Sequence, residues 1–298
     1  IPKKLVTTAP RRTLDKLESI AGFRVRLSDA EIHRAIDRTG VAFAAQTTEI
    51  VPADRLLVTP FSNLGQGGIP ARNFVWQHAL ATGASHHWIF DDNIRKMVRR
   101  WQTRKIECST RAALAAMETF VDRYENVAIA GPNYCMMVPN REPRGPFALN
   151  CHVYSGLLIR NDLPFRWRGR YNEDTDLCLQ VLAAGWCTVQ FNAFLIDKMT
   201  TMTMKGGNAT NLYKGDGRLQ MARSLERAWP GVVRTERRYD RPQHVVHSEW
   251  KRFDTQLVRR RDIDWASLPV VDEMGLELHG TPESAKLSQL TEAHRRKH

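Results

Sequence analysis

The sequence has 298 residues, of which 42% are hydrophobic and 26% are charged, and this composition excludes collagen-like, coiled-coil and intrinsically disordered chains. No uncharged stretch reaches the roughly 18 apolar residues of a membrane-spanning helix, so we expect no membrane partner. Lys and Arg number 44 against 32 Asp and Glu, and the net charge of +12 favours a polyanionic partner such as nucleic acid.

Short apolar runs alternate with helical patterns over the first two thirds of the chain. Strands are predicted over residues 4–8, 23–27, 41–45, 56–59, 87–90, 127–130, 153–159 and 188–191. Helices are predicted over residues 71–80, 109–124 and 174–182, and Gly83 and Gly185 end the first and the last of them. The alternation predicts an α/β fold, Rossmann-like, with a mostly parallel sheet and flanking helices.

After about residue 210 the apolar spacing becomes helical. It predicts two helices, one with Met221, Ala222, Leu225 and Trp229 and one with Trp250, Phe253 and Leu257. From residue 281 onward the chain is polar and has no aromatic residues. We therefore expect a catalytic α/β domain over residues 1–212, a helical C-terminal extension that could contact DNA over 213–280 and a flexible tail over 281–298.

The cysteines give an indication of the cellular compartment. There are five, with no C-x-x-C pair among them: Cys108, Cys135, Cys151, Cys178 and Cys187. Neither a disulfide framework nor a zinc ribbon is indicated. We therefore expect a reducing, cytoplasmic location.

Two short segments concentrate the excess of positive charge, residues 95–105 and residues 251–261. Side chains of this kind hold nucleic acid through its phosphates, although a run of charge can also be a plain solvated face. The candidate phosphate contacts are Arg95, Lys96, Arg99, Arg100, Lys251, Arg252, Arg259 and Arg260.

The stretch from Gly67 to Asn93 carries the first candidate site. The turn Gly67-Gly68 leads into a helix whose first turn contains Arg72, an arrangement that suits a phosphate group. Asp91 and Asp92 follow a strand, at the edge where open α/β sheets bind ligands, and paired carboxylates suit Mg²⁺ or Mn²⁺. Ordinary turn chemistry is the alternative interpretation of both features.

Two further segments are candidates. Glu173, Asp174 and Asp176 begin a predicted helix, where acids stabilise the helix dipole, but one of them could also act as a general base. The loop of Lys205, Gly206, Gly207 and Asn208 could close over phosphates or be a simple turn.

The motifs Gly-Gly-x-x-Ala-Arg-Asn and Phe-Asp-Asp-Asn resemble the nucleotide-sugar half of GT-A glycosyltransferases of the family 2 type. The resemblance implies a UDP-sugar donor and a Mn²⁺ or Mg²⁺ ion on Asp92, with Asp91 as a ribose or metal neighbour. It also implies that Asp174, or less favourably Glu173, is the catalytic base. The remaining donor contacts that it implies are Thr8, Pro10 and Arg11 near the nucleobase, and Gly68, Arg72 and Asn73 with the 205–208 loop near the diphosphate.

The stretch Tyr-Asn-Glu-Asp-Thr-Asp-Leu-Cys-Leu-Gln-Val-Leu and the later Lys-Gly-Gly-Asn narrow the resemblance. They are similar to the TET-associated glycosyltransferases of bacteriophages, relatives of the base J glucosyltransferase, over roughly residues 3–208. This implies a sugar attached to a 5-hydroxymethylpyrimidine in DNA within an infected bacterial cytosol. We expect 5-hydroxymethylcytosine as acceptor and UDP-glucose as donor.

The sequence departs from the family pattern at Asn93, which replaces the second acid of a strict Asp-x-Asp. No third metal ligand is identifiable, and His244 and His247 are candidates by residue type alone. A base in duplex DNA would have to leave the stack to react, which requires a wedge near the site. Trp101, Trp167 and Arg168 are the candidates, with a core role as the alternative for the tryptophans.

Three other functions fit parts of the pattern. The same fold could glycosylate a polysaccharide or a protein instead of DNA. Acid pairs beside basic segments are also typical of metal-dependent nucleases, which need a second metal about 4 Å from the first. A DNA-binding module without catalysis would use the charge alone.

Overall fold

The computed structural model describes residues 59–61, 66–91, 93–101, 104–140, 144–199, 216–246 and 248–269. The strands predicted over 4–8, 23–27 and 41–45, and all of the 56–59 strand except Thr59, lie outside these residues, as does the predicted tail over 281–298. Among the described residues, no helix combines the length and the apolar character needed to cross a bilayer.

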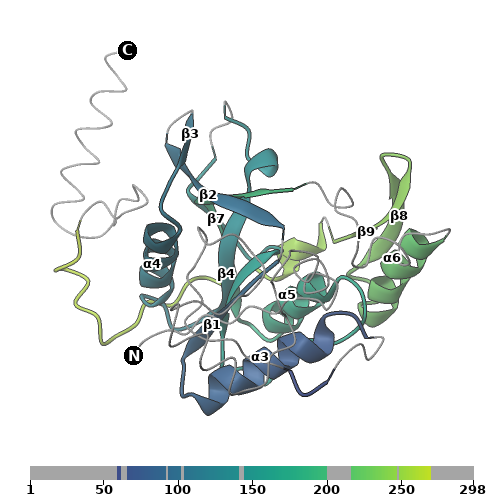
Figure 1. Cartoon of the computed structure of the whole chain (residues 1–298), viewed down its shortest axis with the longest axis horizontal. Coiled ribbons are helices and arrows are strands. Elements are labelled where there is room, and N and C mark those ends of the chain that lie inside the picture. Colours follow the sequence, from purple (N-terminus) through teal and green to yellow (C-terminus); the bar gives the residue numbers. More distant parts are fainter. Residues whose placement is uncertain are drawn as a thin grey trace, which may run out of the picture.

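A seven-stranded sheet forms the centre of the molecule (Figure 1). Its strands are β1 (His86–Phe90), β2 (Ile94–Trp101), β3 (Arg104–Glu107), β4 (Val127–Tyr134), β5 (Phe147–Leu149), β6 (Gly156–Arg160) and β7 (Cys187–Lys198). The order is β1-β6-β4-β7-β2-β3, with β5 also paired to β7. β4 and β7 are parallel, and the other described pairs are antiparallel. The predicted α/β class is confirmed, and the described part of the sheet is mixed.

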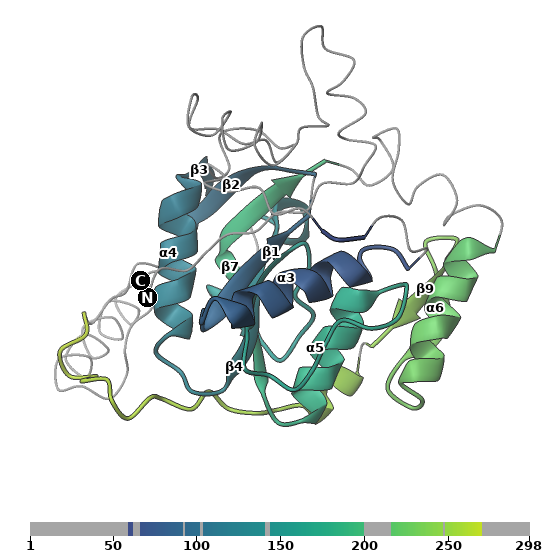
Figure 2. The ribbon, with the colours of Figure 1, turned by 60° about the horizontal axis from the view of Figure 1, so that its bottom comes forward.

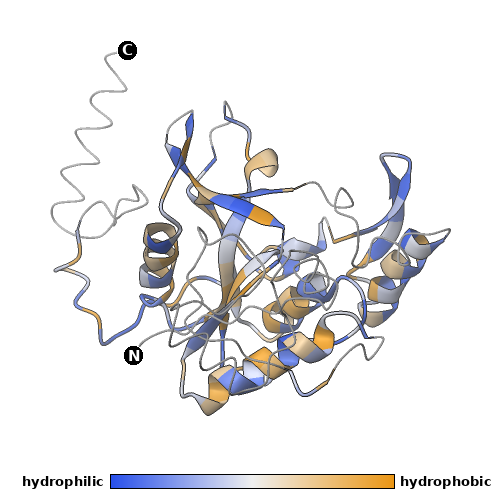
Figure 3. Ribbon diagram, viewed as in Figure 1, coloured by the Kyte–Doolittle hydropathy of each residue, from blue (hydrophilic) through white to orange (hydrophobic). Residues whose placement is uncertain are grey.

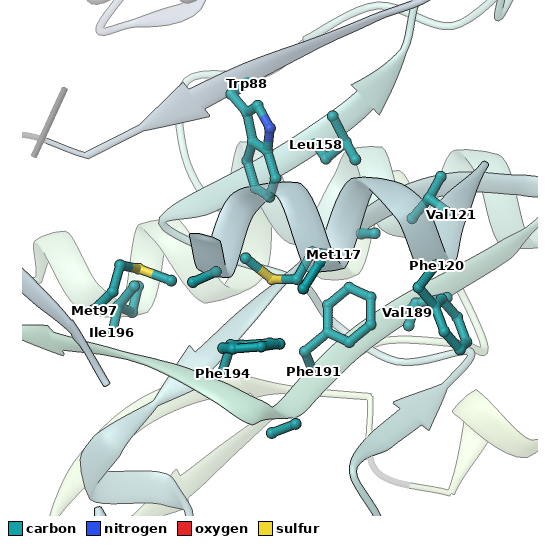
Figure 4. Packing of buried hydrophobic residues seen from close by; sticks show 14 of the residues in the cluster. Trp88, Met97, Met117, Phe120, Val121, Leu158, Val189, Phe191, Phe194 and Ile196 are labelled. Atoms are coloured by element: carbon teal, nitrogen blue, oxygen red, sulfur yellow. The ribbon is translucent and has the colours of Figure 1, made fainter. Parts of the chain in front are cut away.

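Helices cover both faces of this sheet. α4 (Thr110–Val121) lies on one face, and α3 (Ile69–Ala81) and α5 (Glu173–Ala183) lie on the other (Figure 2). Ser109 caps α4 by accepting a hydrogen bond from the Ala112 N–H. Met117 and Phe120 of α4 then pack against Phe191 and Phe194 of β7 (Figure 4). These apolar stripes fix the helices at the positions that their spacing predicts.

The C-terminal region agrees with the sequence only in part. Its first predicted helix is α6 (Gly217–Ala228), but a hairpin of β8 (Arg234–Arg238) and β9 (Arg241–Val245) follows, mostly hydrophilic in Figure 3. The second predicted helix is wrong: one 3-10 turn, η3 (Glu249–Arg252), leads into an extended segment. The Asn126 side chain donates to the Gln256 carbonyl at 2.8 Å and accepts from the Val258 N–H at 2.8 Å. These bonds to distant backbone outweigh the local helical spacing.

Candidate active site

Three strand ends bring charged and polar groups to one edge of the sheet. β6 is antiparallel to both β1 and β4, and β4 is parallel to β7, so β1, β4 and β7 run in one direction. Their carboxyl ends lead to Asp91, Tyr134 and Lys198 respectively. Ser155 precedes the oppositely directed β6 and so lies at the same edge, where α/β sheets bind ligands.

Asp91 is bonded through both carboxylate oxygens. Lys198 Nζ donates to Oδ2 at 2.8 Å and Ser155 Oγ donates to Oδ2 at 2.6 Å. Arg72 Nη2 donates to Oδ1 at 3.3 Å. The Asp91 N–H also donates to the Ser155 carbonyl at 2.7 Å, which fixes the backbone. Asp91 therefore anchors two cations at this edge.

Lys198 is the more enclosed of those two cations, with 15% of its side chain exposed. Its Nζ also donates to Ser155 Oγ at 2.7 Å and to the Tyr134 hydroxyl at 3.2 Å. Burial acts to lower the pKa of Lys198, but Asp91 and Tyr134 outweigh burial and hold the pKa above its ordinary value. Lys198 is therefore a fixed positive charge at neutral pH.

Arg72 connects the two acidic parts of the site. From the first turns of α3 it reaches Asp91, and the same Nη2 lies 3.6 Å from Glu173 Oε1 at the start of α5. Its guanidinium lies over the Trp167 ring, 4.5 Å from the ring centroid. The other terminal nitrogen, Nη1, has no hydrogen-bond partner within the described part of the chain. Arg72 therefore bridges the two acidic groups and keeps one buried terminal nitrogen without a partner among the described residues.

Asp174 is paired with a histidine that the sequence analysis did not identify. His152 Nε2 lies 3.3 Å from Asp174 Oδ2 and 3.2 Å from Thr175 Oγ1, and the Thr175 N–H donates to Asp174 Oδ1 at 2.8 Å. Burial acts to raise the pKa of Asp174, but His152 and Arg72 outweigh burial and hold the pKa well below its ordinary value. Asp174 is therefore an oriented carboxylate that stays ionised.

Glu173 lies beside Asp174 in a different electrostatic environment. Burial raises its pKa, Arg72 acts to lower it, and Asp174 and Asp91 raise it further, leaving the pKa above its ordinary value. His244 of β9 interacts electrostatically with His152 and Asp174: burial and His152 lower the pKa of His244, and Asp174 acts to raise it. The hairpin after α6 thus contributes a histidine to the same environment.

Two residues near the site hold the scaffold together. Asp176 is buried and accepts from Trp229 Nε1 at 2.7 Å, from Gln180 Nε2 at 2.7 Å and twice from Arg168. Asn73 donates to the Trp167 carbonyl at 2.9 Å and accepts from the Trp167 N–H at 3.1 Å. The contacts of Asn73 in this structure are therefore with protein backbone.

Several predicted site residues lie outside the described residues, so their roles stay predictions. They are Thr8, Pro10, Arg11, Asp92, Lys205, Gly206, Gly207, Asn208 and His247. Gly68 is described, and it directly precedes α3 as predicted.

The metal prediction rests on Asp92. Both oxygens of Asp91 accept hydrogen bonds from protein donors, so in this structure Asp91 is an anchor for cations, and its role beside a metal stays a prediction. Within the described residues, no three His, Cys, Asp or Glu side chains form a group that could hold a metal ion.

The first basic segment is the hairpin of β2 and β3, where carboxylates neutralise part of the charge. Arg95 pairs with Asp197 at 2.8 Å, and Lys96 pairs with Glu107 at 2.7 Å. Arg99 lies over the Trp101 ring at 5.2 Å from its centroid.

The second basic segment is spread along the extended C-terminal chain. Arg260 pairs with Asp262, and Arg259 lies over the Trp265 ring at 4.6 Å from its centroid. Lys251 and Arg252 are exposed on η3. The described basic residues therefore do not form one continuous helix face.

Two of the three wedge candidates have structural roles instead. Trp167 is only 2% exposed, and Arg168 is engaged by Asp176 through two hydrogen bonds. Trp101 is 50% exposed at the end of β2.

Four residues that lie around Asp91 and Asp174 were missed in the sequence analysis: Tyr134, His152, Ser155 and Lys198. The strand containing Lys198 was predicted over residues 188–191 only, whereas β7 continues to Lys198. Sequence could have indicated Tyr134 and Lys198 by their position after apolar strands, because the carboxyl ends of parallel strands meet at the edge that carries Asp91.

Comparisons with known proteins identify a family. A family model described as TET-associated glycosyltransferase matches residues 44–207, more than half of the chain. Separately, 45 residues, or 15% of the chain, are 51% identical to a thymidine phosphorylase of Colwellia psychrerythraea, and the match spans 10% of that enzyme's length. No solved structure matches the chain significantly.

Proposed function

The chain belongs to the TET-associated glycosyltransferase family, so it is a glycosyltransferase, and we propose that it transfers a sugar from a UDP-sugar to the hydroxymethyl group of a 5-hydroxymethylpyrimidine in DNA. 5-Hydroxymethylcytosine is the expected acceptor and UDP-glucose the expected donor. The net charge of +12 supports a polyanionic acceptor.

One observation carries the proposal: Arg72 reaches Asp91 on one side and Glu173 on the other. Through Asp91, Arg72 lies beside the second cation, Lys198. Through Glu173, the same guanidinium lies beside the two acids at the start of α5, Glu173 and Asp174. Sugar transfer to a hydroxyl needs both parts, because negative charge develops on the departing diphosphate while the attacking hydroxyl loses a proton.

The donor side consists of Arg72 and Lys198. Both are held by Asp91, so little reorganisation is needed when a diphosphate binds, and fixed charges of this kind stabilise a leaving group effectively. The exposed Gly67-Gly68 turn before α3 leaves room for phosphate oxygens near Arg72.

The acceptor side consists of Asp174 and its partner His152. Asp174 accepts the proton of the hydroxymethyl group as that oxygen attacks the anomeric carbon, and the bond from this carbon to the diphosphate oxygen breaks with inversion. His152 Nε2, 3.3 Å from the carboxylate, orients Asp174 for this step. Glu173 is the second candidate base, because its raised pKa makes it a stronger proton acceptor than Asp174.

A divalent metal ion remains part of the proposal through Asp92. Mn²⁺ or Mg²⁺ on this carboxylate would add positive charge beside the diphosphate when bound. The described residues supply Arg72 and Lys198 for the same purpose, and the steps above rely on these two side chains.

The proposal is tested by measuring UDP release from a panel of UDP-sugars, with duplex DNA containing 5-hydroxymethylcytosine, 5-hydroxymethyluracil or only unmodified bases. We expect release to depend on a hydroxymethylated base. Asp174→Asn should lower kcat by about 10²–10⁴-fold because it removes the base. Glu173→Gln should have a smaller effect, and Asp162→Asn, which changes an exposed carboxylate paired with Arg160, should have none.

Each contrary result has a specific meaning. UDP release that needs no DNA but increases with a glycan or a protein would show that the acceptor is that molecule and not DNA. A larger loss in Glu173→Gln than in Asp174→Asn would exchange their roles. DNA cleavage without UDP release would favour a nuclease, and DNA binding unchanged by any of these variants, with no UDP release, would favour a module without catalysis.

A further inference from the structure

We propose that the turn η1 (Cys135–Met137) is the wedge that enters the DNA stack and holds it open while the target base occupies the active site. This inference rests on the proposed function, because it assumes a duplex DNA acceptor. It assigns a role to two methionines, Met136 and Met137, that none of the preceding steps uses.

The exposure of these methionines is the first observation. Met136 is 80% exposed and Met137 is 50% exposed, although Met is usually buried in globular proteins. They are consecutive, so a single turn presents two exposed apolar side chains to solvent. Methionine is among the side chains that proteins insert between base steps, because it is apolar and its shape adapts to the gap.

The position of the turn is the second observation. η1 follows β4 directly, and Met136 is two residues after Tyr134, so their Cα atoms are at most about 7 Å apart. The Tyr134 hydroxyl in turn contacts Lys198 Nζ in the site. Met136 is therefore two residues from a side chain that contacts the donor side of the site.

Trp101, the remaining wedge candidate, is less well placed. Ile94 is paired with Lys198 at the site edge, and Trp101 lies seven residues further along β2. At about 3.3 Å per residue, that is roughly 23 Å from the pair. Trp101 could touch DNA, but at a distance from the site.

Basic side chains brace the turn and supply charge complementary to DNA. Lys105 Nζ donates to the Cys135 carbonyl at 2.6 Å, and Arg144 Nη1 donates to the Met137 carbonyl at 3.1 Å. Arg100, which is paired with Lys105 across the β2–β3 hairpin, donates to the Arg144 carbonyl at 3.1 Å. The backbone of η1 is thus fixed on both sides by cations, while its methionines remain exposed.

The underside of the turn is packed, which holds its backbone in place. Cys135 and Val138 contact Val98 and Leu195 in a small apolar cluster. The basic side chains around the turn suit the phosphates of DNA, and its exposed methionines suit an opened base step between the strands.

The experiment compares wild type with the double variant Met136→Ala plus Met137→Ala. Two substrates carry 5-hydroxymethylcytosine, one single-stranded and one duplex, and the duplex has 2-aminopurine next to the target so that fluorescence reports base opening. We expect the variant to lose about tenfold or more of kcat/KM on duplex, because opening the stack is then unassisted. On single-stranded DNA it should stay within about twofold, because no base has to leave a duplex.

Leu80→Ala is the matched control, since it truncates a partly exposed apolar side chain near the end of α3. It should leave both substrates and the fluorescence unchanged. Wild-type fluorescence should rise on binding, and the double variant should abolish the rise.

Equal losses on the two substrates, or an unchanged fluorescence rise in the double variant, would overturn the wedge. A rise in wild type that the double variant abolishes, with no sugar transferred to any DNA, would keep the wedge and overturn the proposed reaction. The two inferences can therefore fail separately.

Discussion

At the scale of single residues, Lys198 is the central cation of the proposed donor side. Its ammonium group contacts Asp91, Ser155 and Tyr134, and its pKa lies above the ordinary value. The Asp91 carboxylate, a metal neighbour by resemblance, is therefore neutralised by protein cations. The contribution of this charge to catalysis can be measured by substituting Lys198.

Lys198→Met should lower kcat by about 100-fold and raise the KM for the UDP-sugar, because one fixed positive charge near the diphosphate is lost. Lys198→Arg should keep most of the activity. Steady-state kinetics with varied donor measure both quantities, with Arg111→Met on the exposed face of α4 as a control for loss of one surface charge. Equal kinetics for Lys198→Met and wild type would remove Lys198 from the donor site.

A buried histidine makes the stability of the fold depend on pH. His87 lies in β1 beside the Trp76 ring, and its Nδ1 lies 2.5 Å from Asn161 Oδ1. Burial lowers its pKa from 6.5 to about 4, against the raising effect of the Asn161 hydrogen bond. Between these two values the unfolded chain binds a proton that the folded chain does not, so stability falls as pH falls.

The free energy of unfolding should therefore drop by about 3 kcal/mol between pH 7 and pH 4 through His87 alone. Urea unfolding across this range measures the drop. His87→Gln, which keeps a neutral polar group beside Asn161, should show a correspondingly shallower dependence. The same pH dependence in variant and wild type would show that His87 does not titrate in this way.

At the scale of elements, the site depends on the close approach of β4 and β6. A Cβ atom on Gly131 of β4 would collide with the Gly156 carbonyl and would lie 2.8 Å from Val153 Cγ1. Glycine is thus required by the neighbouring strand, which also brings Ser155 toward Asp91.

Gly131→Ala should destabilise the protein by about 3 kcal/mol or more, because backbone atoms have to move apart. Gly145→Ala is the matched control, since its new Cβ would lie 3.5 Å from the Phe147 carbonyl, an ordinary contact. Denaturant unfolding compares the two variants. Equal stability of both would contradict the packing described for β4 and β6.

The elements also show what sequence could and could not predict. The strand that ends directly before Asp91, β1, and the helix that begins with Glu173 follow from local apolar spacing, and both lie close to where that spacing predicts them. The helix expected around Trp250 fails because Asn126, more than a hundred residues away, bonds the extended backbone. Lys198 was missed for a related reason: its role depends on strand direction and pairing across the sheet.

At the scale of the whole molecule, the net charge supports the proposed DNA acceptor. The chain has a net charge of +12, while several predicted phosphate contacts are paired with acids, as Arg95 is with Asp197. Binding should therefore depend on a limited number of cations around the site, and it should weaken as salt is added. The family supports sugar transfer in general, and the acceptor is the claim that needs the most direct test.

That test is mass spectrometry of nucleosides from duplex DNA containing 5-hydroxymethylcytosine, after incubation with the protein, Mn²⁺ and UDP-glucose, with unmodified duplex in parallel. We predict a gain of one hexosyl group on 5-hydroxymethyl-2′-deoxycytidine alone, absent with Asp174→Asn. If a panel of UDP-sugars leaves both 5-hydroxymethylpyrimidine nucleosides unchanged while UDP is released, the proposed DNA acceptor is contradicted.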